Sequence, residues 1–554
     1  MKKRKIISKV VSILLVLTMT MSLIGCGGSK SEKTDTSSTD TDTANVEGGE
    51  KVVNIGVTNT LTTLNPILMD GGEINKYATG MMFLPLVDLG PDMSFEPMLA
   101  SSITTEDNKN FIVHIDEKAN WSDGKPVTAD DVVFTALRIA SPVVGNTAMM
   151  YYGFEGVGDD GFVEKGATSI PGIVALDEKT VQFTTKNPMS LITFENTYAR
   201  YLLTLPKHVI ESIPEEEIAT NDWFNHPDVV SGPYKVTEYD ADHYISYVAN
   251  ENYWRGKVNI DKLNIKIVTG SQLYAGLQSG EIDFVQQTLG AIPQEDYKSV
   301  EALDNVNVVY GEPVTHQSVF IQSQNEAISD PRVRQAILMG INRQQLVDEL
   351  LGGNGEVVDG FISSASPFYD DSLTAIEYNP EKAKELLDEA GWDGSKTLRF
   401  YVNSGDSTFV NGASVIAAEL EAIGIKVEIQ TVDFTTLMTV AGTKDYDLLA
   451  VQYTYSPVDP FPDVSWLLSG PDSWTGYSNQ EVNDALSKTQ LTSDEKELTT
   501  LYSSIDQTMQ KDVPMFSAYV IRAMGAVSKR IVNATPSVYG SFMLSLSMFT
   551  FPLQ

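Results

Sequence analysis

The chain alternates short apolar runs, of the length of buried β-strands, with longer segments whose apolar residues recur at helical spacing. No fixed-period repeat is visible. Strands are predicted at residues 51–57, 111–115, 173–176, 180–184, 263–268, 306–310, 319–322, 398–402, 425–432 and 446–451. The alternation predicts a mixed α/β fold, and its length indicates at least two lobes.

Several predicted helices carry their own start and stop signals. Thr128 and Asp131 have the spacing of a capping box, in which the acid also suits the positive end of the helix. Asp330 and Asn379 each precede a proline, which costs nothing at the first helical position. Gly391 follows an apolar stripe and is expected to end the helix that Asn379 begins.

The first 50 residues have the pattern of an exported protein. A basic start is followed by an apolar run from about residue 10 to 24, which is too short and too rich in Ser and Thr to span a bilayer well. Leu23-Ile24-Gly25-Cys26 resembles a bacterial lipobox, which predicts a signal peptide at 1–25 and lipidation of Cys26. The alternative is an ordinary signal peptide that carries a cysteine by chance. Residues 26–50 are predicted to be a flexible tether.

Composition removes several classes of function. The 554 residues contain 39 Lys and Arg against 74 Asp and Glu, a net charge of −35 that argues against nucleic-acid binding. Removal of the five basic residues of the signal takes this charge from −35 to −40. One cysteine and five scattered histidines allow no internal disulfide and no thiolate metal cluster, so no metal and no cofactor are expected.

No motif assembles a nucleophile with its base. Residues 156–161 fit G-x-G-x-x-G, but no strong strand leads in, no periodic helix follows, and their two carboxylates would repel a pyrophosphate. The aromatic, proline-rich segment 453–466 follows a predicted strand and suits a loop at a ligand cleft. Alternatively, Phe461 and Trp466 are core residues and the prolines only shape the loop.

Motifs spread along the chain together resemble one family, the oligopeptide-, dipeptide- and nickel-binding solute-binding proteins of ABC importers, known as family 5. The motif with the clearest match runs from Trp121 to Val132 as W-S-D-G-K-P-V-T-A-D-D-V. Further matching segments lie, in the expected order, at residues 63–66, 205–209, 232–234, 252–254, 277–283, 330–336, 341–343 and 379–392.

The resemblance implies an α/β fold of periplasmic-binding-protein type, class II-like, with two lobes, mixed sheets flanked by helices, an extra domain and a hinge. The hinge crossings would lie near Tyr310 and Lys511–Pro514. The implied division is lobe I at 51–92, 215–308 and 513–554, the extra domain at 93–214, and lobe II at 309–512.

In peptide-binding relatives, a Trp and, three residues on, an Asp receive the N-terminus of the ligand. Tyr453 and Ser456 stand at these positions here, and Asp459 is the next acid. Either Asp459 or another acid takes the amine, or the ligand is not an ordinary free-amine peptide. His316 is a candidate because nickel-binding relatives use histidine. The predicted ligand-binding residues are Thr58, Asn59, Thr60, Leu61, Phe284, His316, Tyr453, Tyr455, Ser456, Asp459 and Trp474.

The resemblance therefore implies a binding protein and not an enzyme. We expect a monomeric receptor, anchored through Cys26 on the outer face of the bacterial cytoplasmic membrane, that delivers oligopeptides to an ABC permease and its ATPase subunits. The alternatives with the same fold are a nickel chelate, an oligosaccharide or a signalling peptide as ligand. An extracellular hydrolase is the alternative of another class.

Overall fold

The computed structural model describes residues 50–69, 72–149, 151–289, 292–405, 407–468, 473–532 and 534–546. The predicted signal peptide, Cys26 and the tether up to Gly49 lie outside these residues. Across the part of the chain that the structure describes, no helix combines the length and the apolar character that crossing a bilayer requires.

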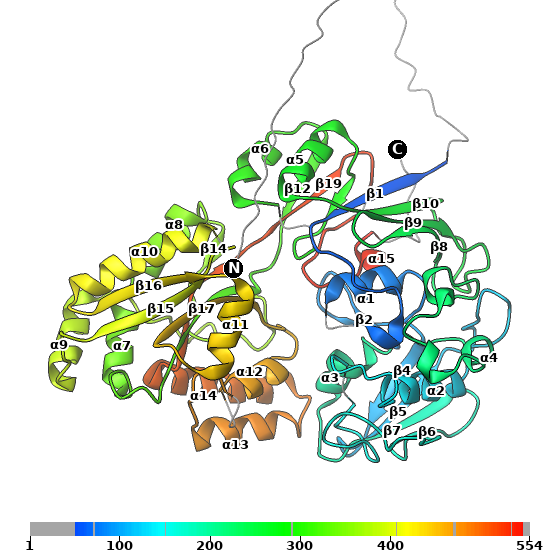
Figure 1. Cartoon of the computed structure of the whole chain (residues 1–554), viewed down its shortest axis with the longest axis horizontal. Coiled ribbons are helices and arrows are strands. Elements are labelled where there is room, and N and C mark those ends of the chain that lie inside the picture. The colour runs from blue at the N-terminus through cyan, green and yellow to red at the C-terminus, as the bar shows by residue number, and fades with distance from the viewer. Residues whose placement is uncertain are drawn as a thin grey trace, which may run out of the picture. The chain divides into compact units, whose positions relative to one another are not determined.

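A seven-stranded sheet contains the first strand of the described chain (Figure 1). β1 lies at its centre and pairs in parallel with β10 and β11, while β19 is antiparallel to β11 and β12. In spatial order the strands are β12 (Val306–Tyr310), β19 (Met524–Ser528), β11 (Phe284–Val285), β1 (Val52–Val57), β10 (Lys262–Ile267), β9 (Tyr244–Ala249) and β8 (Tyr234–Asp240).

Both faces of the central strands of this sheet are covered, because successive side chains point to opposite sides. Ile55 and Ile265 belong to the largest apolar core, and Val285 and Met524 belong to a second core beneath α5. The helices along this part of the chain are η1 (Pro66–Leu68), α1 (Glu73–Gly80), α5 (Gly270–Ser279), η5 (Gln294–Asp296), α6 (Tyr297–Glu301) and α15 (Phe542–Ser545).

Residues between β1 and β8 build a smaller, separate sheet. Its four strands lie in the order β4 (Ala100–Thr105), β5 (Asn110–Ile115), β7 (Thr180–Thr184) and β6 (Ile173–Ala175), beside the two-stranded ribbon of β2 (Val87–Leu89) and β3 (Phe95–Pro97). The helices here are α2 (Ala129–Ile139), α3 (Leu191–Phe194), the π-helical turn η2 (Glu195–Ala199), α4 (Lys207–Ile210), η3 (Glu215–Glu217) and η4 (Asp222–Asn225).

A six-stranded sheet forms from the later part of the chain. Its strands lie in the order β14 (Gly355–Glu356), β18 (Met515–Ile521), β13 (Thr315–Ile321), β17 (Leu448–Thr454), β15 (Thr397–Asn403) and β16 (Lys426–Val432). In β13, Val319 and Ile321 face one apolar core and Phe320 faces another, so helices cover both faces.

The helices that flank this sheet include the two longest of the described chain, α10 and α14 (Figure 1). They are α7 (Pro331–Met339), α8 (Arg343–Leu350), α9 (Pro380–Ala390), α10 (Ser407–Ala422), α11 (Phe434–Thr443), α12 (Phe461–Leu468), α13 (Gln480–Thr489) and α14 (Glu495–Asp512).

The chain passes between the two large sheets at two places. The first lies between β12 and β13, next to Tyr310 as expected. The second lies between β18 and β19, at residues 522–523, and not at Lys511–Pro514. The expectation was wrong because β18, a fully buried strand, pairs with β13 and β14 in the six-stranded sheet before the chain returns. The division into lobes remains a prediction.

The local signals read from the sequence are confirmed where the pattern is strong. Thr128 and Asp131 form the predicted capping box, and the side chains of Asp330 and Asn379 accept backbone N–H groups at the starts of α7 and α9. Gly391 ends α9 in a left-handed conformation with φ 70°. The strands predicted at 173–176 and 180–184 are present as β6 and β7, and they pair antiparallel.

A buried ion pair fixes α1 against the β2–β3 ribbon. Lys76 Nζ lies 2.6 Å from Asp88 Oδ1, and the two side chains are 2% and 4% exposed. Arg200 Nε lies 3.6 Å from the same Asp88 oxygen. Asp88 therefore neutralises two cations that are out of contact with water.

We predict that Asp88→Asn lowers the free energy of unfolding by about 3–5 kcal/mol, because it leaves buried positive charge without its partner. Urea denaturation measures the change. The matched control is Glu385→Gln, which breaks the exposed pair with Lys382 and should cost less than about 1 kcal/mol. Equal losses in the two variants would contradict this role of Asp88.

Candidate functional site

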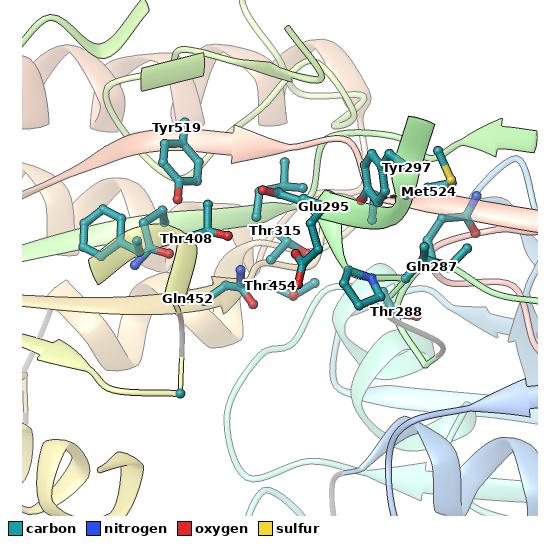
Figure 2. Close-up of a pocket in the computed structure, with 18 of the residues that line it drawn as sticks. Gln287, Thr288, Glu295, Tyr297, Thr315, Thr408, Gln452, Thr454, Tyr519 and Met524 are labelled. Atoms are coloured by element: carbon teal, nitrogen blue, oxygen red, sulfur yellow. Dashed lines mark hydrogen bonds between the residues drawn. The ribbon is translucent and has the colours of Figure 1, made fainter. Parts of the chain in front are cut away.

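One cavity lies where the two large sheets approach each other, and it has a volume of about 480 Å³. Figure 2 shows Gln287, Tyr297 and Met524 at one end of it and Gln452 and Tyr519 at the other. The first group comes from the β11–α6 segment and β19, and the second from β17 and β18. We call this space cavity 1.

A second cavity, of about 560 Å³, lies beside the first, and Thr454 at the end of β17 lines both. We call it cavity 2. Its walls come from α1, from η2 and the residues around it, and from the loop between β17 and α12. Charged and aromatic residues of its wall include Glu73, Arg200, Tyr201, Asp459, Asp463 and Tyr539.

Two carboxylates of the β17–α12 segment lie in the wall of cavity 2, and no cation of the described residues stands beside them. Asp459 is 3% exposed; its Oδ1 accepts a hydrogen bond from the Thr193 hydroxyl at 3.1 Å, and its Oδ2 has no partner among the described residues. Burial raises the pKa of Asp459 to about 7, and the charge of Asp463 adds to this.

Asp463 is more accessible and is held in place by its neighbours. Its two oxygens accept hydrogen bonds from the Tyr453 hydroxyl at 2.9 Å and from the Ser456 backbone N–H at 3.1 Å. Burial raises its pKa to about 6, although both hydrogen bonds act in the opposite direction. Together, Asp459 and Asp463 give this wall an affinity for positive charge.

The other charged groups of cavity 2, Glu73 and Arg200, compensate each other. Burial alone would raise the pKa of Glu73, but Lys76 and Arg200 outweigh it and hold that pKa below its ordinary value. Arg200 Nη2 lies 3.9 Å from Glu73 Oε2, and the Tyr201 hydroxyl donates to the other Glu73 oxygen. The uncompensated charge of cavity 2 is therefore that of the two aspartates.

The π-helical turn η2 contributes a polar side chain to the wall of cavity 2. Asn196 Oδ1 accepts a hydrogen bond from Arg200 Nη1 at 2.9 Å, and Asn196 Nδ2 donates to the Ser456 hydroxyl at 3.3 Å. A π-helix is a rare local structure and is frequent at functional sites. This turn brings Asn196 and Arg200 into the same wall of cavity 2.

Of the residues predicted from the sequence, Ser456 and Asp459 line cavity 2 within the described chain. Tyr453 stands behind them and orients Asp463 through its hydroxyl. The resemblance leads one to expect an Asp at position 456, where this chain has Ser456. Two other acidic residues, Asp459 and Asp463, line the same cavity.

Three predicted residues belong to the packed interior. Phe284 is 0% exposed in β11. His316 is 1% exposed, shares a hydrogen bond of 2.7 Å with the Ser517 hydroxyl, and has a pKa lowered to about 3 by burial. Tyr455 packs edge-on against His316 at 4.8 Å, and its hydroxyl is 3.1 Å from that of Ser318. These side chains support the sheets behind the cavities.

The remaining predicted residues lie apart from the described walls of both cavities. Thr58 bonds to the backbone of Leu289, and Leu61 belongs to the largest core; Asn59 and Thr60, between them, are exposed. Trp474 packs against Phe320 and Trp466 at 5.4 and 4.8 Å. Trp466 is 43% exposed, so the alternative that made it a core residue is wrong.

Sequence reasoning missed Asp463, Asn196, Arg200 and the amides of cavity 1. Asp463 stands in the quoted segment 453–466, but an acid in the first turn of a helix has an ordinary explanation in the helix dipole. Within the described residues, no group of three or more His, Cys, Asp or Glu side chains is arranged to hold a metal ion.

The raised pKa of Asp459 predicts a pH-dependent stability. Between its unfolded value near 3.8 and its folded value of about 7, the folded protein holds the proton more tightly, so stability is lost as the pH rises through this window. Asp459→Asn, which cannot ionise, should raise the free energy of unfolding of the ligand-free protein at pH 8 by up to about 4 kcal/mol. Little change is expected at pH 4.

Denaturant unfolding of both proteins at the two pH values measures this difference. Asp240→Asn is the control, because Asp240 is exposed and its pKa is lowered, mainly by its hydrogen bond with His243. That variant should gain no stability at pH 8. A gain for Asp459→Asn that is the same at pH 4 and pH 8 would show that ionisation is not its cause.

Comparisons with known proteins agree with this architecture. The sequence profile of bacterial extracellular solute-binding proteins, family 5 (middle part), matches residues 94–475. The oligopeptide-binding protein AppA of Bacillus subtilis is 27% identical over 495 residues, which cover 85% of this chain and 86% of AppA.

Two solved structures have the same fold. AppA of Bacillus subtilis in complex with a nonapeptide has a TM-score of 0.70 at 23% identity, with 91% of this chain and 100% of that chain covered. NikZ of Campylobacter jejuni in complex with Ni(L-His) has a TM-score of 0.71 at 20% identity, with the same coverage. The predicted α/β fold of periplasmic-binding-protein type is confirmed. The chain belongs to family 5 of the bacterial extracellular solute-binding proteins, the substrate-binding proteins of ABC transporters.

Proposed function

We propose that this protein captures peptides with a free α-amino group in cavities 1 and 2 and delivers them to an ABC permease driven by ATPase subunits. The amino group would bind at Asp459 and Asp463 in cavity 2. The following residues of the peptide would extend past Thr454, which lines both cavities, into cavity 1.

The uncompensated aspartates are the observation that carries this proposal. A buried carboxylate that lacks a cation is costly, and burial accordingly raises the pKa of both Asp459 and Asp463. A ligand ammonium would return both groups to their charged form and gain charge-assisted hydrogen bonds. The similarity to an oligopeptide-binding protein supports a peptide as the source of that ammonium.

We further propose the lobe division expected from the sequence, with its second crossing moved to residues 522–523. The walls of cavity 1 come from both large sheets, and the chain crosses between these sheets twice. A ligand that contacts both walls favours the state in which they are close, which is the usual basis of hinge closure.

The proposed location is the outer face of the cytoplasmic membrane, with the protein present as a monomer. Lipid on Cys26 would be the anchor, and the polar residues 27–50 would let the folded part move near the permease.

For ligand binding, we predict that peptides of two to eight residues stabilise the protein in a thermal shift assay, and that N-acetylation of the same peptides weakens binding by about tenfold or more, since a neutral amide cannot pair with the aspartates. Isothermal titration calorimetry gives the affinities. Acetylated peptides that bind as tightly as the free ones would refute the placement of the amine.

Asp463→Asn should weaken the binding of the free peptides by about tenfold or more. It should also reduce the difference in affinity between the free and the acetylated peptides. Asp240→Asn, in the exposed pair with His243, should leave both affinities unchanged. Stabilisation by no peptide in this length range would overturn the peptide assignment as a whole.

For the anchor, we predict that Cys26→Ser moves the protein from the membrane to the soluble extracytoplasmic fraction, because it removes the site of lipidation. Phase partition in Triton X-114 measures this change. Ser29→Ala, three residues on, is the control and should stay in the detergent phase. A Cys26→Ser protein that still partitions into detergent would contradict lipidation at this residue.

A further inference from the structure

Uncharged polar groups form part of the wall of cavity 1, beside apolar residues such as Ile292, Ile521 and Met524. Amide side chains from several elements line it, and so do Thr315, Thr454 and Tyr519 with their hydroxyl groups (Figure 2). The amides are those of Gln287, Gln294, Gln317, Asn403 and Gln452. Within the described part of the chain, this wall contains no Lys, Arg or His, and its single carboxylate is that of Glu295.

The amide of Gln287 is held in one orientation. Its Nε2 donates to the backbone carbonyls of Val309 and Pro536 at 3.3 and 3.2 Å. A Cβ at Gly525 would lie 2.9 Å from this amide, and a Cβ at Gly311 would lie 3.0 Å from its Cγ, so both glycines leave the space that the side chain occupies. With the nitrogen bound to carbonyls, Oε1 is left as an acceptor without a partner among the described residues.

Gln317, on a strand of the six-stranded sheet, carries a second unpartnered acceptor. It lies in β13, between β17 and β18, at the register shift between Gln317 and Ser318, and it is 2% exposed. Its Oε1 also has no partner among the described residues. A buried amide oxygen without a donor costs stability, which a ligand donor can restore.

Gln452 and Thr454 present polar groups on the β17 side of the same wall. Both residues are exposed, and the Thr454 hydroxyl is 2.9 Å from that of Thr315, on the paired strand β13. A donor in the ligand therefore meets adaptable groups at the surface of the cavity, and behind them lie the buried, unpartnered oxygens of Gln287 and Gln317.

This chemistry discriminates among peptide side chains. A ligand carboxylate would lose its water without gaining a cation, and it would approach Glu295. An aliphatic side chain would leave the amides of the wall unpaired. An amide or a hydroxyl can both donate to the glutamine oxygens and accept from the glutamine nitrogens.

We propose that cavity 1 is a specificity subsite for a peptide residue with an uncharged amide or hydroxyl side chain, namely Gln, Asn, Ser or Thr. This inference rests on the proposed peptide function: the amino group is bound in cavity 2, and Thr454, common to both cavities, fixes where the later residue enters.

The test uses the full mature chain and a scan of the pentapeptide AAAAA, in which each position in turn carries Gln, Glu or Leu. These side chains are similar in size and differ in charge and hydrogen bonding. Calorimetry should find one position, after the first, where Gln binds at least about tenfold more tightly than Glu and Leu. At the other positions, the affinities of the Gln, Glu and Leu peptides should differ by no more than about threefold.

Gln452→Leu tests the wall itself, because the exposed Gln452 side chain can be replaced without disturbing the sheet. It should reduce the preference for Gln over Leu at that position to less than about threefold. Gln430→Leu, on β16 of the same sheet and outside the described walls of both cavities, is the control and should keep the full preference. Gln452→Arg should favour the Glu peptide instead.

The possible failures are distinguishable. If no pentapeptide binds, the proposed function is wrong and the subsite falls with it. If the pentapeptides bind but no position prefers Gln, the proposed subsite is refuted and peptide binding is not. The same holds if the preference for Gln over Leu survives in both Gln452→Leu and Gln317→Leu. Thermal melts of each variant establish that it is folded.

Discussion

The last two strands of the described chain, β18 and β19, each lie inside one of the two large sheets, and the chain between them connects the sheets. β18 lies between β14 and β13, and β19 lies between β12 and β11, so each strand is an interior member of its sheet. All residues of both strands are buried. Neither sheet is complete without this segment, and Tyr519 and Met524, which line cavity 1, belong to it. The cavity between the sheets is thus built on the same backbone that joins them.

The buried charges described above fall into two groups: those that have an oppositely charged partner and those that do not. Arg343 and Asp359 form a close, buried pair in the second half of the chain, and Arg530 pairs with the fully buried Asp283 near β11. Such pairs cost little folding free energy once each charge has its partner and its hydrogen bonds. Asp459 and Asp463 differ, because their hydrogen-bond partners within the described chain are hydroxyl and backbone N–H groups and not cations. A charge left uncompensated in a cavity points to a ligand.

Local and regular features could be predicted from the sequence. The start and end of α9 follow from Asn379 and Gly391, because these residues act through the backbone nearest to them. The site was harder to predict: segment 453–466 contains a strand end, a loop and the start of α12, and its pattern favoured Asp459 over Asp463. The amides of Gln287 and Gln452 have no spacing signal, since strand pairing over long sequence distances brings them together. Phe284 was misassigned because a strand of two residues does not reveal which way its side chains point.

The π-helical turn η2 has a consequence for how related proteins diverge. A π-turn closes its hydrogen bonds over one residue more than an α-turn, so deletion of a single residue there would convert it to a regular helix. Each residue of an α-helix turns the chain by about 100°, and the deletion would therefore change which side chains among 196–200 reach the cavity. The turn belongs to neither large sheet. A one-residue length change at this turn is thus a route by which ligand preference could evolve while the scaffold stays intact.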